Sequence, residues 1–531
     1  MATSLILLDL LAKTTQNKDK KYSFINLEPI LSYKYYGLSE AFRAITEEEK
    51  DLEAFKTSFY AKNLIESYAF FKEKISDTPV GTLEKMFDAL IKKMLFSVVG
   101  LNDNRIDPFS SFETINNRGK DLSTLELLKN RLHFVAHKIC DEGDLENLQN
   151  EINDTYTRIY HNLRFFKDDH LEDFLKYFVA YYYGEKRDFK ERLLNTAFDA
   201  HKKYDDLYDE YEKINDLLLH LSYSSKVWYF LHTLDEKSIA LIFDDNRKLE
   251  MEITPKMRNL LDKMRRLNAL SYNAFLPLLL SLLTIQLAVR SGSERHYTTQ
   301  ELEGLLEYLE RFGFLIYGVA DGKKTAKNEW IELAFKAIQA YRFWGDKITI
   351  EDLPTLEKNF FKGKYSGLEL LEESIHSKKN AEKWYRWGKA LNYLLYEYEL
   401  RHNPETTLNF DSSIESIEHI LPQNPDQGYS AKEKNWAKNP NIVHALGNLL
   451  LIPKNANSSL SNKPFEEKRK EYLKGSYSEK EVAKNASFGV AQIKERSEKL
   501  LDFLIAHYRI AELVGESAIK AFKNALLKDI K

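Results

Sequence analysis

The chain has 531 residues, more than a single hydrophobic core usually accommodates, so about two to four domains are expected. Hydrophobic residues make up 43% of the chain and charged residues 30%, which excludes an intrinsically disordered protein. The formal net charge of -4 provides no global attraction to nucleic acid, so any DNA-binding surface must be local.

Glycine and proline are scarce, at 20 and 12 residues, and this scarcity favours helices over turns and strands. The single cysteine, Cys140, excludes an intrachain disulfide framework and fits a reducing compartment. The N-terminal residues lack a basic region and a cleavage site for secretion. The most apolar stretch, residues 274–285, is shorter than the about 20 residues of a membrane span. We therefore expect a cytoplasmic protein without a membrane segment.

The N-terminal part of the chain shows helical periodicity with one extended run. Helices are expected at residues 4–13, 54–75 and 83–95. The run FSVVG, residues 96–100, is rich enough in β-branched residues to predict a short strand. This region is predicted to be mainly helical.

The block FETINNRGKDLSTLELLKNRL, residues 112–132, is the first with a distinctive pattern. Asn116 and Arg118 lie in a polar turn, and Ser123 with Glu126 matches a capping box. The apolar residues after it recur every three or four positions, which predicts an amphipathic helix. The block is either a capped helix after a turn or a functional segment in which Asn116 and Arg118 lie near a nucleotide or a domain interface.

The middle of the chain predicts one aromatic-rich helix after another, without a fixed repeat period. The expected helices are residues 171–183, 208–221, 260–289, 299–315 and 330–344. Within this region, GVADGKKT at residues 318–325 superficially resembles a phosphate-binding P-loop. Its first glycine is one residue too close to the Gly-Lys pair, so we interpret it as a loop.

The pattern changes in the C-terminal part, where a polar linker is expected at residues 401–413. Two short apolar runs, residues 417–421 and 448–452, predict strands, and a helix is expected at residues 463–473. Further helices are expected at residues 490–508 and 511–530. Strand, loop, strand and helix is the order of a ββα-metal nuclease, which holds one divalent cation against the scissile phosphate.

Four residues of this segment offer the groups that phosphodiester hydrolysis needs. The imidazole of His419 titrates near neutral pH and can accept a proton from water. Glu418 and Asn457 offer oxygens to a hard divalent cation such as Mg²⁺. The amide of Asn448 can hold the imidazole in one tautomer.

Three stretches resemble a known family. IEHILPQ and LGNLLLIPKNANSSLSNKPFEEKRKEYL resemble the C-terminal nuclease domain of the GmrSD-type, modification-dependent restriction endonucleases. FETINNRGKDLSTLELLKN resembles a block of the same family's N-terminal domain, and the blocks occur in the family's order. The resemblance implies an HNH, or His-Me finger, nuclease that cuts DNA, including modified DNA, in phage defence.

By motif position the resemblance implies a role for each residue. His419 is similar to the general base and Asn448 to the residue that orients it. Glu418 and Asn457 occupy the places of the metal ligands for Mg²⁺ or another divalent cation.

Two lysines complete the implied site. Lys463 and Lys468 fall where the family has recurrent basic residues, and we expect them to contact DNA phosphates. The window 431–484 has a local excess of basic residues, which is the pattern of either a solvated helix face or a phosphate-binding surface.

One departure concerns the nucleotide. The DGQQR signature of the family's N-terminal domain, associated with nucleotide hydrolysis, is missing from this sequence. The opening MATSLILLDLL resembles the family's segment directly after that signature, so we expect a truncated, split or mis-started gene, or a divergent member. NTP hydrolysis by this chain is therefore not supported, and a partner subunit is the expected source of the missing segment.

The predicted protein is mainly α-helical and multidomain, with a small ββα-metal nuclease module among C-terminal helices. The expected domains are a truncated N-terminal regulatory domain at residues 1–145, a helical middle region at 146–380 and an HNH nuclease domain at 381–531. The predicted function is a metal-dependent DNA endonuclease with a histidine general base. The alternatives are a non-catalytic regulatory or DNA-binding subunit of a split system without NTPase activity, and a nucleotide-binding regulator.

Overall fold

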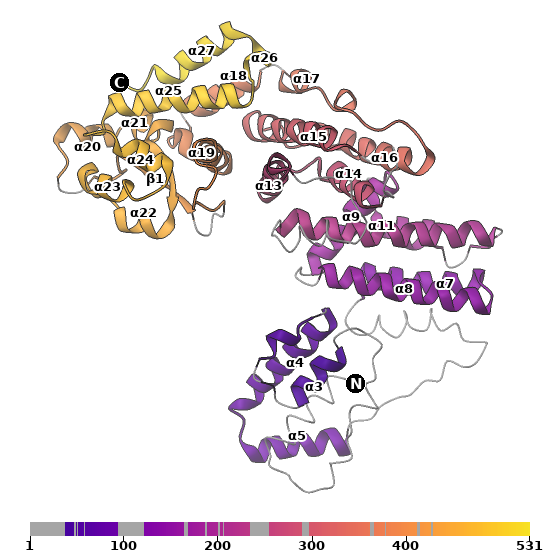
Figure 1. The fold of residues 1–531 in the computed structure, drawn as a ribbon. Coiled ribbons are helices and arrows are strands. Elements are labelled where there is room, and N and C mark those ends of the chain that lie inside the picture. Colours follow the sequence, from indigo (N-terminus) through magenta and orange to yellow (C-terminus); the bar gives the residue numbers. More distant parts are fainter. Residues whose placement is uncertain are drawn as a thin grey trace. The chain divides into compact units, whose positions relative to one another are not determined.

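A computed structural model gives the architecture of the chain (Figure 1). The residues it describes are 38–46, 49, 51–57, 59–93, 122–163, 168–185, 188–199, 202–204, 206–233, 254–288, 297–361, 366–377, 379–410, 415–425 and 428–531. The predicted helix at 4–13, the predicted strand at 96–100 and the turn with Asn116 and Arg118 lie outside these residues.

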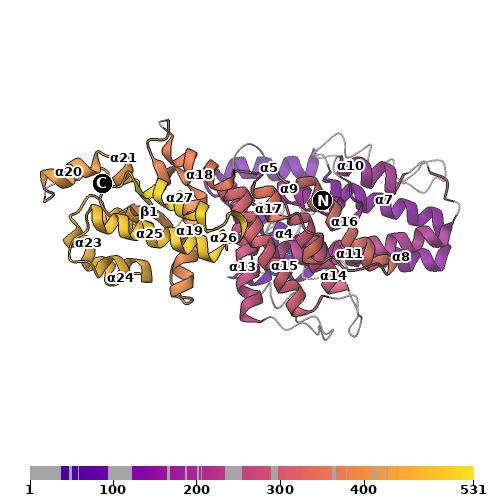
Figure 2. The same ribbon diagram turned by 90° about the horizontal axis from the view of Figure 1, so that it is seen from above.

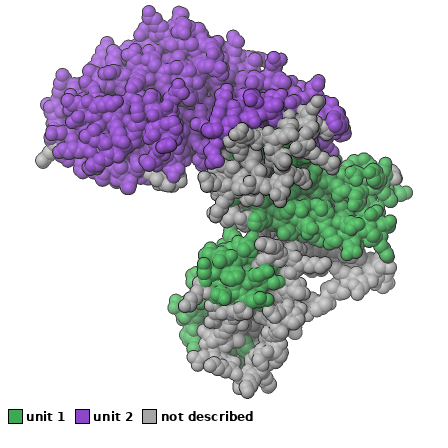
Figure 3. All heavy atoms as spheres, viewed as in Figure 1, with its two compact units in different colours: residues 1–230, 235–246, 283–288 green, residues 231–234, 247–282, 289–531 purple. Residues whose placement is uncertain are grey.

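The chain divides into two compact units, coloured separately in Figure 3. Unit 1 comprises residues 1–230, 235–246 and 283–288, and unit 2 comprises residues 231–234, 247–282 and 289–531. The helices of unit 1 are α3 (Leu38–Thr46), η2 (Glu53–Phe55), α4 (Phe59–Ser76), α5 (Val80–Lys92), α7 (Thr124–Ile139), α8 (Glu142–Leu163), α9 (Asp168–Tyr182), α10 (Phe189–Glu191), η3 (Arg192–Ala197) and most of α11 (Leu207–Thr233).

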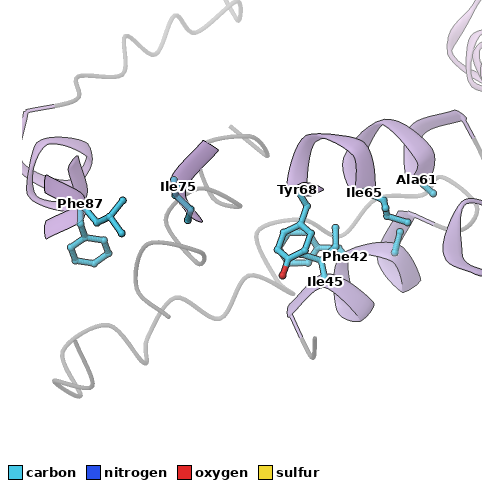
Figure 4. Packing of buried hydrophobic residues seen from close by; sticks show 9 residues of the cluster. Phe42, Ile45, Ala61, Ile65, Tyr68, Ile75 and Phe87 are labelled. Atoms are coloured by element: carbon cyan, nitrogen blue, oxygen red, sulfur yellow. The ribbon is translucent and has the colours of Figure 1, made fainter. Parts of the chain in front are cut away.

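Helix α7 confirms the amphipathic helix predicted after the polar turn. Ser123 caps it by accepting the backbone N–H of Glu126, and the Glu126 carboxylate accepts the Ser123 N–H at 2.8 Å, which completes the capping box. The residues of its apolar stripe, Leu125, Leu128, Leu132, Val135 and Ile139, are all buried. A smaller core joins α3 and α4, where Phe42 and Ile45 lie beside Ile65 and Tyr68 (Figure 4).

Unit 2 carries the C-terminal part of the chain. Its helices are α13 (Pro255–Ala269), most of α14 (Leu276–Ala288), α15 (Thr299–Phe312), η4 (Gly313–Val319), α16 (Lys327–Phe343), η5 (Ile350–Asp352), α17 (Leu356–Phe360), α18 (Gly367–His376), η6 (Lys383–Trp387), α19 (Lys389–His402), α20 (Ala431–Ala437), α21 (Pro440–Val443), η7 (Leu446–Asn448), α22 (Lys454–Leu460), α23 (Phe465–Tyr472), α24 (Tyr477–Ala483), α25 (Val490–His507), α26 (Ala511–Val514) and α27 (Glu516–Leu527). The expected border at residue 381 falls inside unit 2 and coincides with no division between units.

The single helix predicted at 260–289 is two helices, α13 and α14. Ser271 lies between them with φ of 63°, a left-handed conformation that ends α13. Pro277 lies in the first turn of α14, where a missing backbone N–H is tolerated. The apolar stretch at residues 274–285 falls mostly in α14, whose residues are buried, and none of the described helices combines the length and apolarity that crossing a bilayer requires.

Two strands in unit 2 pair antiparallel: β1 (Glu415–His419) and β2 (Leu449–Pro453). The register sets His419 opposite Leu449 and Glu415 opposite Pro453. Both ribbon views place the pair among helices α19 to α25 (Figure 2). Helix α22 comes directly after β2 and packs against both strands, so the helix of this arrangement begins earlier than the predicted one at residue 463.

The turn before β2 is fixed by α25. Arg496 of α25 donates one guanidinium N–H to the carbonyl of Gly447 at 2.9 Å and one to that of Leu449 at 2.8 Å. The backbone N–H of Gly447 donates to Ser497 Oγ at 2.8 Å. A Cβ at residue 447 would lie 2.0 Å from the Ile493 carbonyl oxygen, so only glycine allows α25 this close.

Candidate active site

Two histidines meet at the end of β1. His419 is the last residue of the strand, and its Nε2 lies 3.0 Å from Nδ1 of His444, which comes directly after α21. Tyr385 of η6 covers both rings, with centroids 4.8 Å from His419 and 5.8 Å from His444. His419 is only 7% exposed, so solvent reaches it from a restricted direction.

The partners of His419 set its charge and tautomer. The Nε2 amide of Gln423 lies 3.3 Å from His419 Nδ1 and can only donate, so Nδ1 accepts and the ring proton sits on Nε2. Nε2–H then donates to His444. Burial, with smaller contributions from His444 and Lys468, lowers the pKa of His419 to about 3. The imidazole is therefore neutral near pH 7.

Asn448, at the end of η7, is completely buried and joins the chain segments that carry the two histidines. Its Nδ2 donates to the carbonyl of Leu421 at 2.9 Å and to that of Val443 at 2.7 Å, while its Oδ1 accepts the Leu421 N–H at 2.7 Å. Leu421 lies two residues after His419, and Val443 directly precedes His444. Asn448 thus fixes the backbone around both histidines without touching either ring in the contacts described.

Glu418 lies in different surroundings from His419, because neighbouring strand residues point to opposite faces. Its Oε1 accepts Lys468 Nζ at 2.5 Å and the Tyr472 hydroxyl at 3.1 Å, both from α23. Burial raises the pKa of Glu418, although the charge of Lys468 opposes this shift. Burial also lowers the pKa of Lys468, because it disfavours the charged form of each group. The carboxylate is therefore already paired with a cation.

The burial of Lys468 corrects its predicted contact with DNA phosphate. Its side chain has 0% exposure, and Nζ also donates to the backbone carbonyl of His419 at 2.9 Å. A buried ammonium needs such partners because it has lost its hydration. Lys468 therefore supports the strand end, whereas Lys463, the other predicted phosphate contact, is exposed.

Asn457 lies on α22, half-buried against β1. Its Nδ2 donates to Ser416 Oγ at 2.8 Å and to the Ile417 carbonyl at 3.2 Å. These contacts attach α22 to the strand two to three residues before His419. Among the described contacts, no residue touches the side chains of both Asn457 and Glu418, the two predicted metal ligands.

A metal site needs a set of converging donor atoms. A hard divalent cation prefers several oxygen ligands. At β1, the Glu418 carboxylate is already paired with the Lys468 ammonium, which occupies the position that a metal ion would need. The described residues around β1 therefore do not form a ready oxygen site for a divalent cation.

A second group in unit 2 has metal-type ligands: Glu310, Glu397 and His507. Glu397 is paired with Arg266 at 2.6 Å and with Lys263 at 3.1 Å, and Glu310 lies 3.7 Å from Lys263. Two protein cations already balance these two carboxylates, so the group is an ion-pair network.

Sequence reasoning assigned no role to His444, Tyr385 or Gln423. Gln423 ends one of the stretches that carry the family resemblance, and His444 lies two residues before another; their side chains meet His419 only through the fold. Tyr385 comes from η6, well before β1, and no sequence pattern indicated it.

A comparison with protein families found a match, and it covers the segment that contains these residues. Residues 371–503 match the C-terminal domain of GmrSD restriction endonucleases. The match runs from α18 into α25 and includes both strands, the histidine pair, Asn448 and Asn457. It confirms the predicted resemblance for this part of the chain, which is similar to the C-terminal domain of these enzymes. Comparisons with curated proteins and with solved structures found no significant match.

Proposed function

We propose that the GmrSD C-terminal domain of this chain hydrolyses phosphodiester bonds in DNA, with His419 as the proton acceptor. The observation that carries the proposal is the neutral His419–His444 pair at the end of β1, inside the segment matched by the family. The family's name supports a restriction role, and from it we infer action on foreign DNA, including modified DNA, in phage defence.

The orientation of His419 supports its proposed role. Its Nε2–H donates to His444, so the lone pair on Nδ1 faces Gln423. Gln423 is exposed, and its amide is 3.3 Å from Nδ1, so a water or a hydroxyl nucleophile can take its place when the side chain turns. The nucleophile's proton passes to Nδ1, and His444 stabilises the imidazolium that forms by accepting from its Nε2–H.

The other residues are assigned positioning roles. Asn448 holds the two histidine segments together, and Asn457 attaches α22 to β1. The order β1, η7 with β2, and α22 supports an HNH-type ββα arrangement, with His419, Asn448 and Asn457 as its three motif residues. Lys463, which is exposed after α22, is proposed to contact a DNA phosphate.

The requirement for Mg²⁺ or another divalent cation is proposed from the family alone. Glu418 can serve as a ligand only if Lys468 is displaced, and Asn457 is the other proposed ligand. When bound, the cation would neutralise charge on the phosphate oxygens.

The ion pair between Glu418 and Lys468 supports a second candidate function. Because Glu418 is neutralised by Lys468, the domain can bind DNA without a free carboxylate for catalysis. The chain would then act as the DNA-binding or regulatory subunit of a split system, with a partner subunit supplying the remaining activity.

Plasmid cleavage by the purified full chain separates these candidates. We expect nicking or linearisation with Mg²⁺ or Mn²⁺, on plain or modified DNA, and none in EDTA. His419→Ala should bind the same DNA without cutting it. DNA binding without cleavage by the unmodified chain, under all of these conditions, would favour the regulatory subunit, and equal cutting in EDTA would refute the metal requirement.

A further inference from the structure

We propose that unit 2 has a binding pocket for a phosphate-bearing small molecule of mononucleotide size. The pocket has a volume of about 530 Å³ and lies between the loop after η4, the C-terminal end of α18, and η6. This volume lies in the usual range of small-molecule sites, roughly 300 to 1,000 Å³. The pocket is separate from the polar groups that surround His419.

The charge of the lining favours an anion. Lys323, Lys379 and Arg386 contribute cations, whereas Asp321 is the one carboxylate among the lining residues. The ion pair of Lys323 with Asp321, 3.5 Å apart, is exposed and weak, so Lys323 can turn to a phosphate, and the lining adds the charges of Lys379 and Arg386. Both of these side chains are exposed, so they can approach a phosphate without a large desolvation cost.

The rest of the lining suits the neutral part of such a ligand. Trp387 and Tyr272 offer aromatic surfaces, and Ser374 and Ser377 offer hydroxyls. Asn380 is 6% exposed, and its Oδ1 has no hydrogen-bond partner among the residues that the structure describes. A buried acceptor without a partner is unfavourable, so a ligand donor that reaches it would be stabilised.

The loop that supplies Lys323 is the GVADGKKT segment. It is not spaced as a P-loop, and two of its backbone amides already have partners: Gly322 N–H donates to the Ile316 carbonyl and Thr325 N–H to the Gly322 carbonyl, each at 2.7 Å. The side chain of Lys323 therefore makes the contact. The neighbouring Lys324 does not line the pocket, which provides a matched control.

The helical turn η6 connects the pocket with the histidine pair. Arg386 and Trp387 line the pocket, while Tyr385, directly before them, packs on His419 and His444. The Nδ2 of Asn380 fastens this turn to α18 by donating to the Ser374 carbonyl at 2.9 Å and to the Lys383 carbonyl at 3.2 Å. A ligand in the pocket would thus touch the same short turn that covers the candidate active site.

Calorimetric titration of the full chain with ADP and with inorganic pyrophosphate tests the proposal. We expect saturable binding of ADP, weakened about tenfold or more by Lys323→Ala or Arg386→Ala, the effect of losing one charge-assisted hydrogen bond. Lys324→Ala should bind ADP as the unmodified chain does. Trp387→Phe should abolish an ADP-dependent change in tryptophan fluorescence while the protein remains folded.

Two results would overturn the proposal. One is the absence of binding by ADP and pyrophosphate, or binding that neither Lys323→Ala nor Arg386→Ala affects. The other is a loss of affinity for a DNA duplex in both variants, with no binding of ADP to the unmodified chain. That result would make the pocket a DNA contact. The titration measures binding, so its outcome is independent of whether the chain cuts DNA.

Discussion

Two buried clusters of polar side chains in unit 2 differ in how their charges are balanced. Around Glu397, the carboxylates of two glutamates meet Arg266 and Lys263, so that each charge has an opposite charge beside it. Around the imidazole ring of His419 the contacting side chains are neutral: an imidazole, an amide and a phenol ring. The first cluster is suited to holding helices α13, α15, α19 and α25 together, and the second to exchanging a proton.

Closely packed acidic and histidine side chains therefore do not by themselves identify a reactive site. Glu310, Glu397 and His507 have metal-type ligand atoms close together, yet protein cations already satisfy the two carboxylates. The histidine pair lies beside exposed Gln423, so Nδ1 of His419 can exchange partners. Replacing residues in each cluster should accordingly affect different properties.

The largest expected effect is on catalysis by the neutral cluster. His419→Gln should reduce the rate of DNA cleavage by about 10² to 10⁴, the usual loss when a general base is removed. His376→Gln, which changes a histidine on α18 that lies 3.4 Å from Asp529, should leave the rate unchanged. Single-turnover cleavage of a supercoiled plasmid measures both. A His419→Gln variant that cuts at the unmodified rate would remove His419 from the mechanism.

The charged cluster should instead control stability. Arg266→Met should lower the free energy of unfolding of unit 2 by about 3 kcal/mol, because Glu397 is left buried with less compensating charge. Lys92→Met breaks the exposed Lys92–Asp88 pair, 3.0 Å long, and should change stability by less than about 0.5 kcal/mol. Urea unfolding followed by tryptophan fluorescence compares the two. Equal shifts of the two midpoints would contradict the structural role of the cluster.

The pH dependence of stability should also depend on the neutral cluster. The pKa of His419 is lowered to about 3 in the folded chain, below the value of about 6.5 in an unfolded chain. The unfolded state therefore binds more protons between these two values, and stability falls as pH decreases through this window. The contribution of one histidine approaches about 1.4 kcal/mol per pH unit.

Urea midpoints measured between pH 7 and 4 test this dependence. His419→Gln should reduce the slope of stability against pH, because glutamine does not titrate. Lys520→Ala, at an exposed position on α27, should keep the slope of the unmodified chain. A slope that is the same in all three proteins would show that His419 is not held neutral by its surroundings.

The smallest expected effect concerns the surface beside the neutral cluster. Lys463→Ala should weaken DNA binding and reduce the slope of log affinity against log salt concentration by about 1, as for one lost phosphate contact. Lys520→Ala, an exposed lysine on α27, should leave both quantities unchanged. Fluorescence anisotropy with a labelled duplex measures them. An unchanged salt slope in Lys463→Ala would exclude a phosphate contact there.

The sequence predicted those parts of the fold and the site that depend on local pattern. The stripe and capping box of α7 were predicted, as was a strand that contains His419, although this strand spans Glu415–His419 and not residues 417–421. Helix α22 was missed because its sequence, KNANSSL, contains residues that form helices poorly, and its contacts with both strands stabilise it instead. The role of Lys468 was missed because its burial depends on the packing of α23 on β1.

The contact between Gly447 and α25 determines how long a fragment that carries the histidine pair must be. The motif residues end at Asn457, but the turn that precedes β2 is held by Arg496 and Ser497, some forty residues further along the chain. A fragment that stops after α24 would lose both hydrogen-bond partners and leave the backbone N–H and carbonyl of Gly447 without them. For protein engineering, the shortest portable version of this domain therefore extends through α25, and fusion partners belong beyond it.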